Sequence, residues 1–188
     1  MFIVGLLVFV LGRSSFVVDA SGGTEYTVEV SRSVLREYVD DIGLFARNMP
    51  GVVGIESLGD DVFLYHTRKE IPLSGAMETT FRIRKIVESD SVTRYQSVDP
   101  DDDNYMSCTV RVRPRGEDRT AIAIALTIRL ARENPSEVHW LAPVFGADFI
   151  SERMNEDIEG MLEAFVQNST TELQGKYMAE TREADGAR

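Results

Sequence analysis

The triplet Met49-Pro50-Gly51 constrains the fold of this chain most, because it ends one kind of structure and begins another. Before it, SRSVLREYV and DDIGLFARN carry apolar residues at helical spacing, with Ser31 or Ser33 as a candidate N-cap. A residue before proline is pushed out of the α region, and glycine frees the chain to turn. The triplet therefore predicts two short helices followed at once by a strand.

Apolar and polar residues alternate with a period of two on both sides of this triplet, which predicts a sheet. TEYTVEV, starting at Thr24, is the first strand-like run, and six more follow the triplet, separated by turns such as Gly59-Asp60-Asp61 and the acidic loop DPDDDN. In SGAMETTFRIRKIV, for example, Met77, Thr79 and Phe81 share one face and charged residues occupy the other. Antiparallel sheets with one solvated face have this pattern.

A long helix is predicted after the last strand. PVFGADFISERMNEDIEGMLEAFVQNSTTEL places an apolar stripe opposite acidic residues, and a helix of that length must lie across something. The stripe consists of Phe145, Phe149, Ile158, Met161, Leu162, Phe165 and Val166. Residues 176–188 are expected to form a polar, frayed tail.

Composition limits the classes of function. The length of 188 residues fits one domain, and the single cysteine, Cys108, excludes an intramolecular disulfide. The net charge of −11, from 31 acidic and 20 basic residues, makes nucleic acid and anionic membranes poor partners. We expect a cytoplasmic protein, with membrane association and secretion through residues 1–20 left open.

The N-terminal segment, residues 1–23, allows three interpretations. It contains the apolar run Phe2–Leu11, which is too short to span a bilayer and has no basic residue before it. It is a weak signal peptide, an edge strand of the domain, or an upstream extension. The domain itself is expected to cover residues 24–175.

The order of elements resembles the START-like (SRPBCC) superfamily, whose helix-grip fold includes polyketide cyclases/dehydratases and ligand carriers. NMPGVVGIESLGDD looks most like the branch typified by the G-type subunit of carbon monoxide dehydrogenase, with Met49 in place of a leucine. The resemblance implies an α+β fold: a curved antiparallel sheet of about seven strands around a long C-terminal helix, with two short helices after the first strand. It also implies a cavity between sheet and helix.

Flexible thioethers and aromatic side chains on the apolar faces are suited to an adaptable cavity. By the resemblance, Trp140, Phe145 and Phe149 stand at or beside its mouth. If the cavity binds an apolar ligand, polar groups such as Tyr65, Thr79 and Tyr95 are expected to give specificity. The expected cavity residues are Phe63, Tyr65, Met77, Thr79, Phe81, Tyr95, Met106, Cys108, Trp140, Phe145 and Phe149.

Signals for catalysis or metal binding are weak. His66 and His139 have no partner at the spacing of metal ligands. Cys108 lies on the same face of its expected strand as apolar residues, which is typical of a buried cysteine that acts as a small hydrophobic side chain. The acidic loop DPDDDN lacks the glycine and the distal glutamate of a calcium loop. We therefore expect no cofactor, no metal and no catalytic residue.

Three functions remain open. The favoured one is non-catalytic binding or carriage of a lipid, isoprenoid or quinone-like molecule, with a peripheral membrane or protein-complex contact as accessory to a redox or membrane complex. The second is a polyketide cyclase/dehydratase-like enzyme, with His66, Tyr65 and Tyr95 as acid/base candidates if they face inward. The third is a co-chaperone-like interaction module, which a filled core would favour. The oligomeric state is left open.

Overall fold

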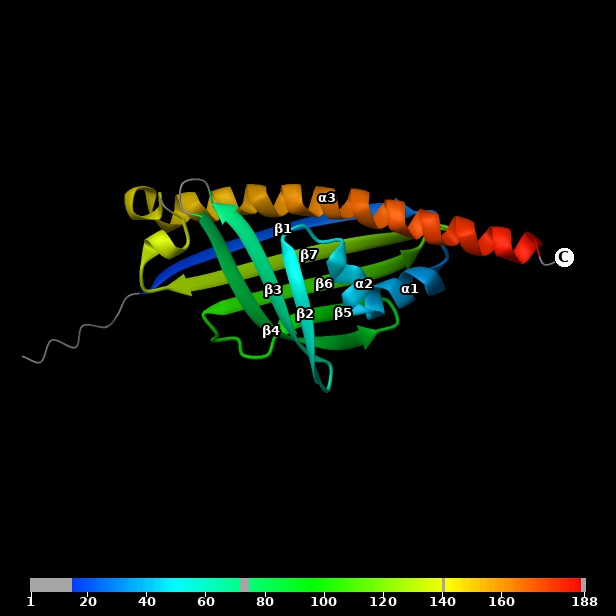
Figure 1. Cartoon of the computed structure of the whole chain (residues 1–188), viewed down its shortest axis with the longest axis horizontal. Helices are drawn as coiled ribbons and strands as arrows, with labels where there is room; N and C mark the ends of the chain where they lie inside the picture. The colour runs from blue at the N-terminus through cyan, green and yellow to red at the C-terminus, as the bar shows by residue number, and fades with distance from the viewer. Residues whose placement is uncertain (1–14, 72–74, 140, 187–188) are drawn as a thin grey trace, which may run out of the picture.

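A seven-stranded antiparallel sheet and one long helix make up most of the molecule (Figure 1). The computed structural model describes residues 15–71, 75–139 and 141–186. The strand order is β1-β7-β6-β5-β4-β3-β2. The strands are β1 Phe16–Val28, β2 Val52–Gly59, β3 Val62–Ile71, β4 Gly75–Ser89, β5 Val92–Ser97, β6 Asn104–Pro114 and β7 Thr120–Arg132. The helices are α1 Arg32–Asp40, α2 Ile42–Arg47, the short 3-10 helix η1 Pro135–Glu137 and α3 Ala142–Gly186.

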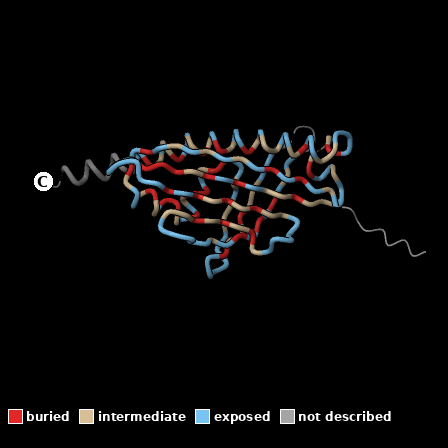
Figure 2. The backbone as a smooth tube through the Cα atoms, turned by 180° about the vertical axis from the view of Figure 1, so that it is seen from behind, coloured by how far each residue is buried: buried red, intermediate tan, exposed pale blue. Residues whose placement is uncertain are grey.

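Burial alternates along the strands (Figure 2). The antiparallel seven-stranded sheet, the two short helices after β1 and the long helix α3 confirm the predicted helix-grip fold. In β6, Met106, Cys108, Val110 and Val112 are buried, while the residues between them are partly or fully exposed. The buried face packs on α3, and the main core lies between them. Burial of this apolar face is the main force that holds the helix on the sheet.

The two short helices end where the sequence predicts. Ser31 caps α1 by accepting a hydrogen bond from the Val34 amide, and Asp41 caps α2 in the same way. Helix α2 ends at Arg47, Gly51 takes a left-handed conformation with φ +82°, and β2 begins at Val52. The turn brings the start of β2 next to β3, where the Arg68 amide donates to the Gly51 carbonyl at 2.8 Å.

Helix α3 crosses β1 at a point where only glycine fits. A Cβ on Gly22 would lie 2.6 Å from Cγ2 of Ile158, so the missing side chain allows the close approach. Beside it, the Ser21 amide donates to Oδ1 of Asn155 at 2.7 Å. Further along, Phe165 packs against Phe45 of α2, with ring centroids 5.0 Å apart. These contacts fix α3 against both the sheet and the short helices.

Three sequence-based expectations need correction. Strand β1 begins at Phe16, not at Thr24, and it is an edge strand, so residues 16–23 fit the edge-strand interpretation of the N-terminal segment; residues 1–14 lie outside the described residues. Helix α3 extends to Gly186, so residues 176–186 are helical, not a frayed tail. The apolar stripe of α3 does not include Phe145 and Phe149, which are 53% and 39% exposed. Gly146 has φ +80° and interrupts the helix, which breaks the expected periodicity there.

Candidate ligand cavity

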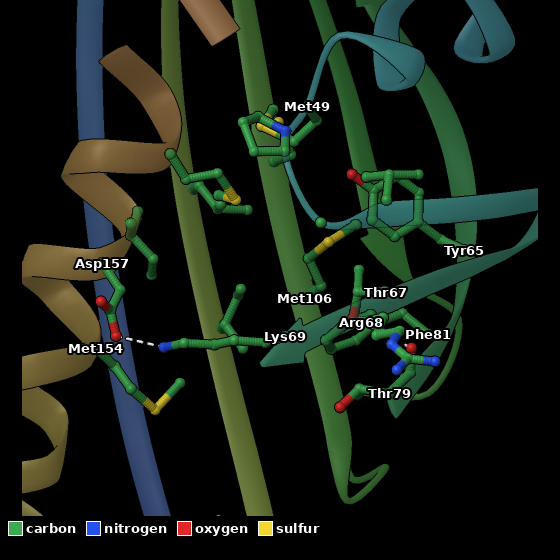
Figure 3. A pocket seen from close by; sticks show the side chains of 18 of the residues that line it. Met49, Tyr65, Thr67, Arg68, Lys69, Thr79, Phe81, Met106, Met154 and Asp157 are labelled. Carbon is green, nitrogen blue, oxygen red and sulfur yellow. Dashed lines mark hydrogen bonds and ion pairs between the residues drawn. The ribbon is translucent and has the colours of Figure 1, made fainter. Parts of the chain in front are cut away.

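A cavity of about 490 Å³ lies between the sheet, α3 and the turn that joins α2 to β2 (Figure 3). Its floor comes from β3, β4, β5, β6 and β7, and its wall from one side of α3. The volume is within the range of small-molecule sites, which is about 300–1,000 Å³. Most of the lining side chains are apolar, so the cavity can take up an apolar molecule.

Seven of the expected cavity residues do line it. They are Tyr65, Met77, Thr79, Phe81, Tyr95, Met106 and Cys108. Phe63 is partly buried against the core but is not among the lining residues. Phe145 and Phe149 are exposed and also do not line the cavity, and Trp140 lies outside the described residues.

The two cavity tyrosines differ in what their hydroxyls do. Tyr95 donates to the Val39 carbonyl at 2.5 Å and thereby ties the sheet to the end of α1. Within the described residues, no hydrogen bond joins the Tyr65 hydroxyl to another group. Burial raises the pKa of both phenols above the ordinary range, so both are neutral donors at physiological pH.

Cys108 lies in the floor of the cavity as a neutral thiol. It is 4% exposed, and burial raises the pKa of its thiol from the ordinary value of 9.0 to about 12. A nucleophilic cysteine needs a lowered pKa and some exposure, and Cys108 has neither. Its contribution to the cavity is apolar surface.

The open side of the cavity, its mouth, carries charged residues that the sequence-based list omits. Lys69 at the end of β3 forms an ion pair with Asp157 of α3 across this side (Figure 3). Arg68 nearby pairs with Glu70 and Glu78. The position of Lys69 was predictable, because it follows Tyr65 at an even spacing and so shares its face of the strand. Asp157 was not predictable, because only the helix's position on the sheet brings it to the mouth.

The other acid/base candidate, His66, does not reach the cavity. Its Nδ1 lies 2.9 Å from Oγ1 of Thr80 on the opposite face of the sheet from Tyr65. In the described part of the chain, no group of three or more His, Cys, Asp or Glu side chains is arranged to hold a metal ion. No described helix is long and apolar enough to cross a membrane.

No family model matches the chain, and no curated protein matches its sequence. Solved structures match its fold. The Zhui aromatase/cyclase from Streptomyces sp. R1128 matches with a TM-score of 0.60 at 15% identity, over 83% of this chain and 94% of that one. A START superfamily protein from Mycobacterium smegmatis matches with a TM-score of 0.60 at 13% identity, over 82% and 97% of the two chains. Norcoclaurine synthase from Thalictrum flavum matches with a TM-score of 0.50 at 17% identity, over 86% and 98%. The chain thus shares the helix-grip fold of these structures.

The buried thiol predicts a specific loss of stability in alkali. Because the folded state raises the pKa of Cys108 from 9.0 to about 12, its contribution is complete below pH 9 and is lost as the pH rises toward 12. One such group lowers the free energy of unfolding by up to about 1.4 kcal/mol per pH unit in that window. The free energy of unfolding, measured with denaturant at several pH values between 9 and 12, should fall less steeply with pH for Cys108→Ala than for the wild type. The same pH dependence in both proteins would contradict the assignment of a buried, protonated thiol.

Proposed function

We propose that this protein binds and carries a hydrophobic small molecule, of the lipid, isoprenoid or quinone-like class, in the cavity between the sheet and α3. The observation that carries the proposal is the mostly apolar cavity of about 490 Å³ bordered by residues of the main core. Protein interiors rarely leave such volumes unfilled, because each missing contact costs stability. A ligand that fills the space gains roughly 25 cal/mol for each Å² of apolar surface it buries.

The chemistry of the lining supports carriage over catalysis. Of the three acid/base candidates, His66 faces away, Tyr95 is bonded to the backbone, and Tyr65 is a neutral phenol deep in the core. Acid/base catalysis works best with groups whose pKa lies near the working pH. The second candidate function, a cyclase-like enzyme, is favoured by the structural similarity to an aromatase/cyclase. The cavity itself argues against the third, because an interaction module needs no hollow core.

Titration with N-phenyl-1-naphthylamine, a neutral apolar fluorophore, tests the proposal. We expect a saturable rise in emission at one molecule per chain, because the probe leaves water for an apolar cavity. The absence of saturable binding at probe concentrations up to its solubility limit would refute binding of apolar molecules in the cavity.

An exposed apolar surface supports the further proposal of a peripheral membrane contact. Val144, Phe145 and Phe149 at the start of α3 are 75%, 53% and 39% exposed, and the two rings pack on each other with centroids 4.8 Å apart. Strand β1 begins at the same end of the molecule (Figure 1), preceded in sequence by the apolar run Phe2–Leu11. Exposed aromatic side chains that lie together are typical of interaction surfaces. Since the protein is acidic, a zwitterionic bilayer is the surface that fits.

Co-sedimentation with phosphatidylcholine vesicles measures this contact. We expect the wild type to pellet with the vesicles and the double variant Phe145→Asp, Phe149→Asp to remain in solution, because two carboxylates oppose insertion. Val53→Asp is the matched control, since Val53 is 62% exposed on β2, at the other edge of the sheet from β1. Wild-type protein that stays in the supernatant, or equal loss in the control, would exclude a membrane contact at this surface.

A further inference from the structure

Five polar side chains are buried among the described residues, and one of them differs from the rest. Thr93, Ser97, Thr120 and Ser169 each have a hydrogen-bond partner in the protein. Thr79 is 5% exposed, and its Oγ1 has no partner among the described residues. The other buried polar atom without a partner is Nε of Arg94, but that guanidinium pairs with Glu88 through another nitrogen. Among these five side chains, Thr79 is therefore the one whose hydroxyl has no partner in the described residues.

Thr79 lies in the wall of the cavity. It sits in β4 between Met77 and Phe81, which line the same cavity, and faces the same side of the sheet (Figure 3). Thr67, its direct partner in β3, donates its hydroxyl proton to the Thr79 carbonyl at 3.2 Å and makes no hydrogen bond to the Thr79 hydroxyl. The side chain that carries this unused hydroxyl therefore borders the cavity.

A buried hydroxyl without a partner costs about 1–3 kcal/mol, and most buried polar atoms in native proteins are paired. A water molecule could pair with it, but a stable buried water needs two to four polar partners. Met77 and Phe81 on either side offer none, and the Thr67 hydroxyl, whose proton is already used, can only accept. Valine has nearly the same shape as threonine, so packing alone does not require the hydroxyl at this position.

We propose that Thr79 is a specificity residue that recognises a hydroxyl or carbonyl oxygen on an otherwise apolar ligand. The inference rests on the proposed function and narrows its ligand class from hydrocarbon-like molecules to oxygen-bearing ones, such as alcohols, phenols and ketones. Burial of the ligand's oxygen against Thr79 satisfies both groups at once, whereas a pure hydrocarbon leaves Thr79 unpaired. A site built in this way discriminates against ligands that lack the polar group.

A matched pair of probes tests this. 2-Naphthol and 2-methylnaphthalene have the same ring system and differ in a hydroxyl against a methyl group. Their affinities are measured by displacement of N-phenyl-1-naphthylamine, whose own affinity is determined for each variant. We expect Thr79→Val to weaken binding of 2-naphthol by about fivefold to tenfold and to leave 2-methylnaphthalene within about twofold. Thr79→Ser, which keeps the hydroxyl, is expected to bind both probes nearly as the wild type does.

The outcomes separate the two proposals. If both probes bind the wild type and Thr79→Val affects neither or both equally, the cavity binds apolar molecules but Thr79 does not select an oxygen. If the selective loss appears in Tyr65→Phe instead of Thr79→Val, the recognising group is the Tyr65 phenol and the assignment to Thr79 is wrong. If N-phenyl-1-naphthylamine itself does not bind the wild type, the proposed function fails and the inference fails with it; if it binds but neither naphthalene displaces it, only the inference fails.

Discussion

Ala164→Trp is expected to weaken binding of N-phenyl-1-naphthylamine by about tenfold or more, because the indole occupies the space that the ligand needs. Ala164 is a small, partly buried residue of α3 whose side chain lines the cavity. The substitution replaces a methyl group of the helix wall with a much larger ring system. Fluorescence titration of the folded variant measures the effect.

Glu163→Trp is the matched control for this change. It adds the same side chain to the same turn of α3, but Glu163 is exposed and does not line the cavity. The control should bind the probe as the wild type does, and circular dichroism should show that both variants keep the fold. Equal binding by wild type and Ala164→Trp would place the probe somewhere other than the cavity.

Phe165→Ala is expected to lower the free energy of unfolding by about 3–5 kcal/mol, the usual cost of removing a buried phenylalanine. Phe165 is 0% exposed and packs against Phe45 of α2, which in turn lies against Tyr95 with ring centroids 6.0 Å apart. Loss of the ring leaves a hole where α3, α2 and the sheet meet. Urea unfolding followed by circular dichroism provides the measurement.

Phe145→Ala controls for the removal of a phenylalanine from the same helix. Because Phe145 is 53% exposed, its loss should change the free energy of unfolding by no more than about 0.5 kcal/mol. A large loss in Phe145→Ala, or a small one in Phe165→Ala, would contradict the way α3 is seated on the sheet.

The arrangement of strands and helices was predictable because its signals are local. Period-two alternation of apolar and polar residues located β2 to β7, since most of these strands bury one face and expose the other. Met49-Pro50-Gly51 located the change from helix to strand, because proline and glycine restrict the backbone in ways that no tertiary contact needs to supply. The same strand parity placed Tyr65, Thr79 and Cys108 on the face that lines the cavity.

The features that sequence reasoning missed depend on contacts between distant segments. The first half of β1 was missed because it contains Ser21, Gly22 and Gly23, which have poor strand propensity. Glycine is needed at position 22 because Ile158 of α3 passes close over it, which no local pattern indicates. The helical periodicity continued through Gly146, although the backbone there is not helical. The cavity itself is a difference between the volume that the elements enclose and the volume that their side chains fill. No pattern along the chain reports that difference.

Native mass spectrometry of gently purified protein tests the central claim most directly, because it weighs the protein together with whatever its cavity holds. We predict a population heavier than the bare chain by the mass of one small apolar molecule, which organic extraction releases and which is absent from Ala164→Trp. Protein at the bare mass, unchanged after incubation with a total lipid extract, would contradict the claim that the cavity is a binding site for hydrophobic molecules.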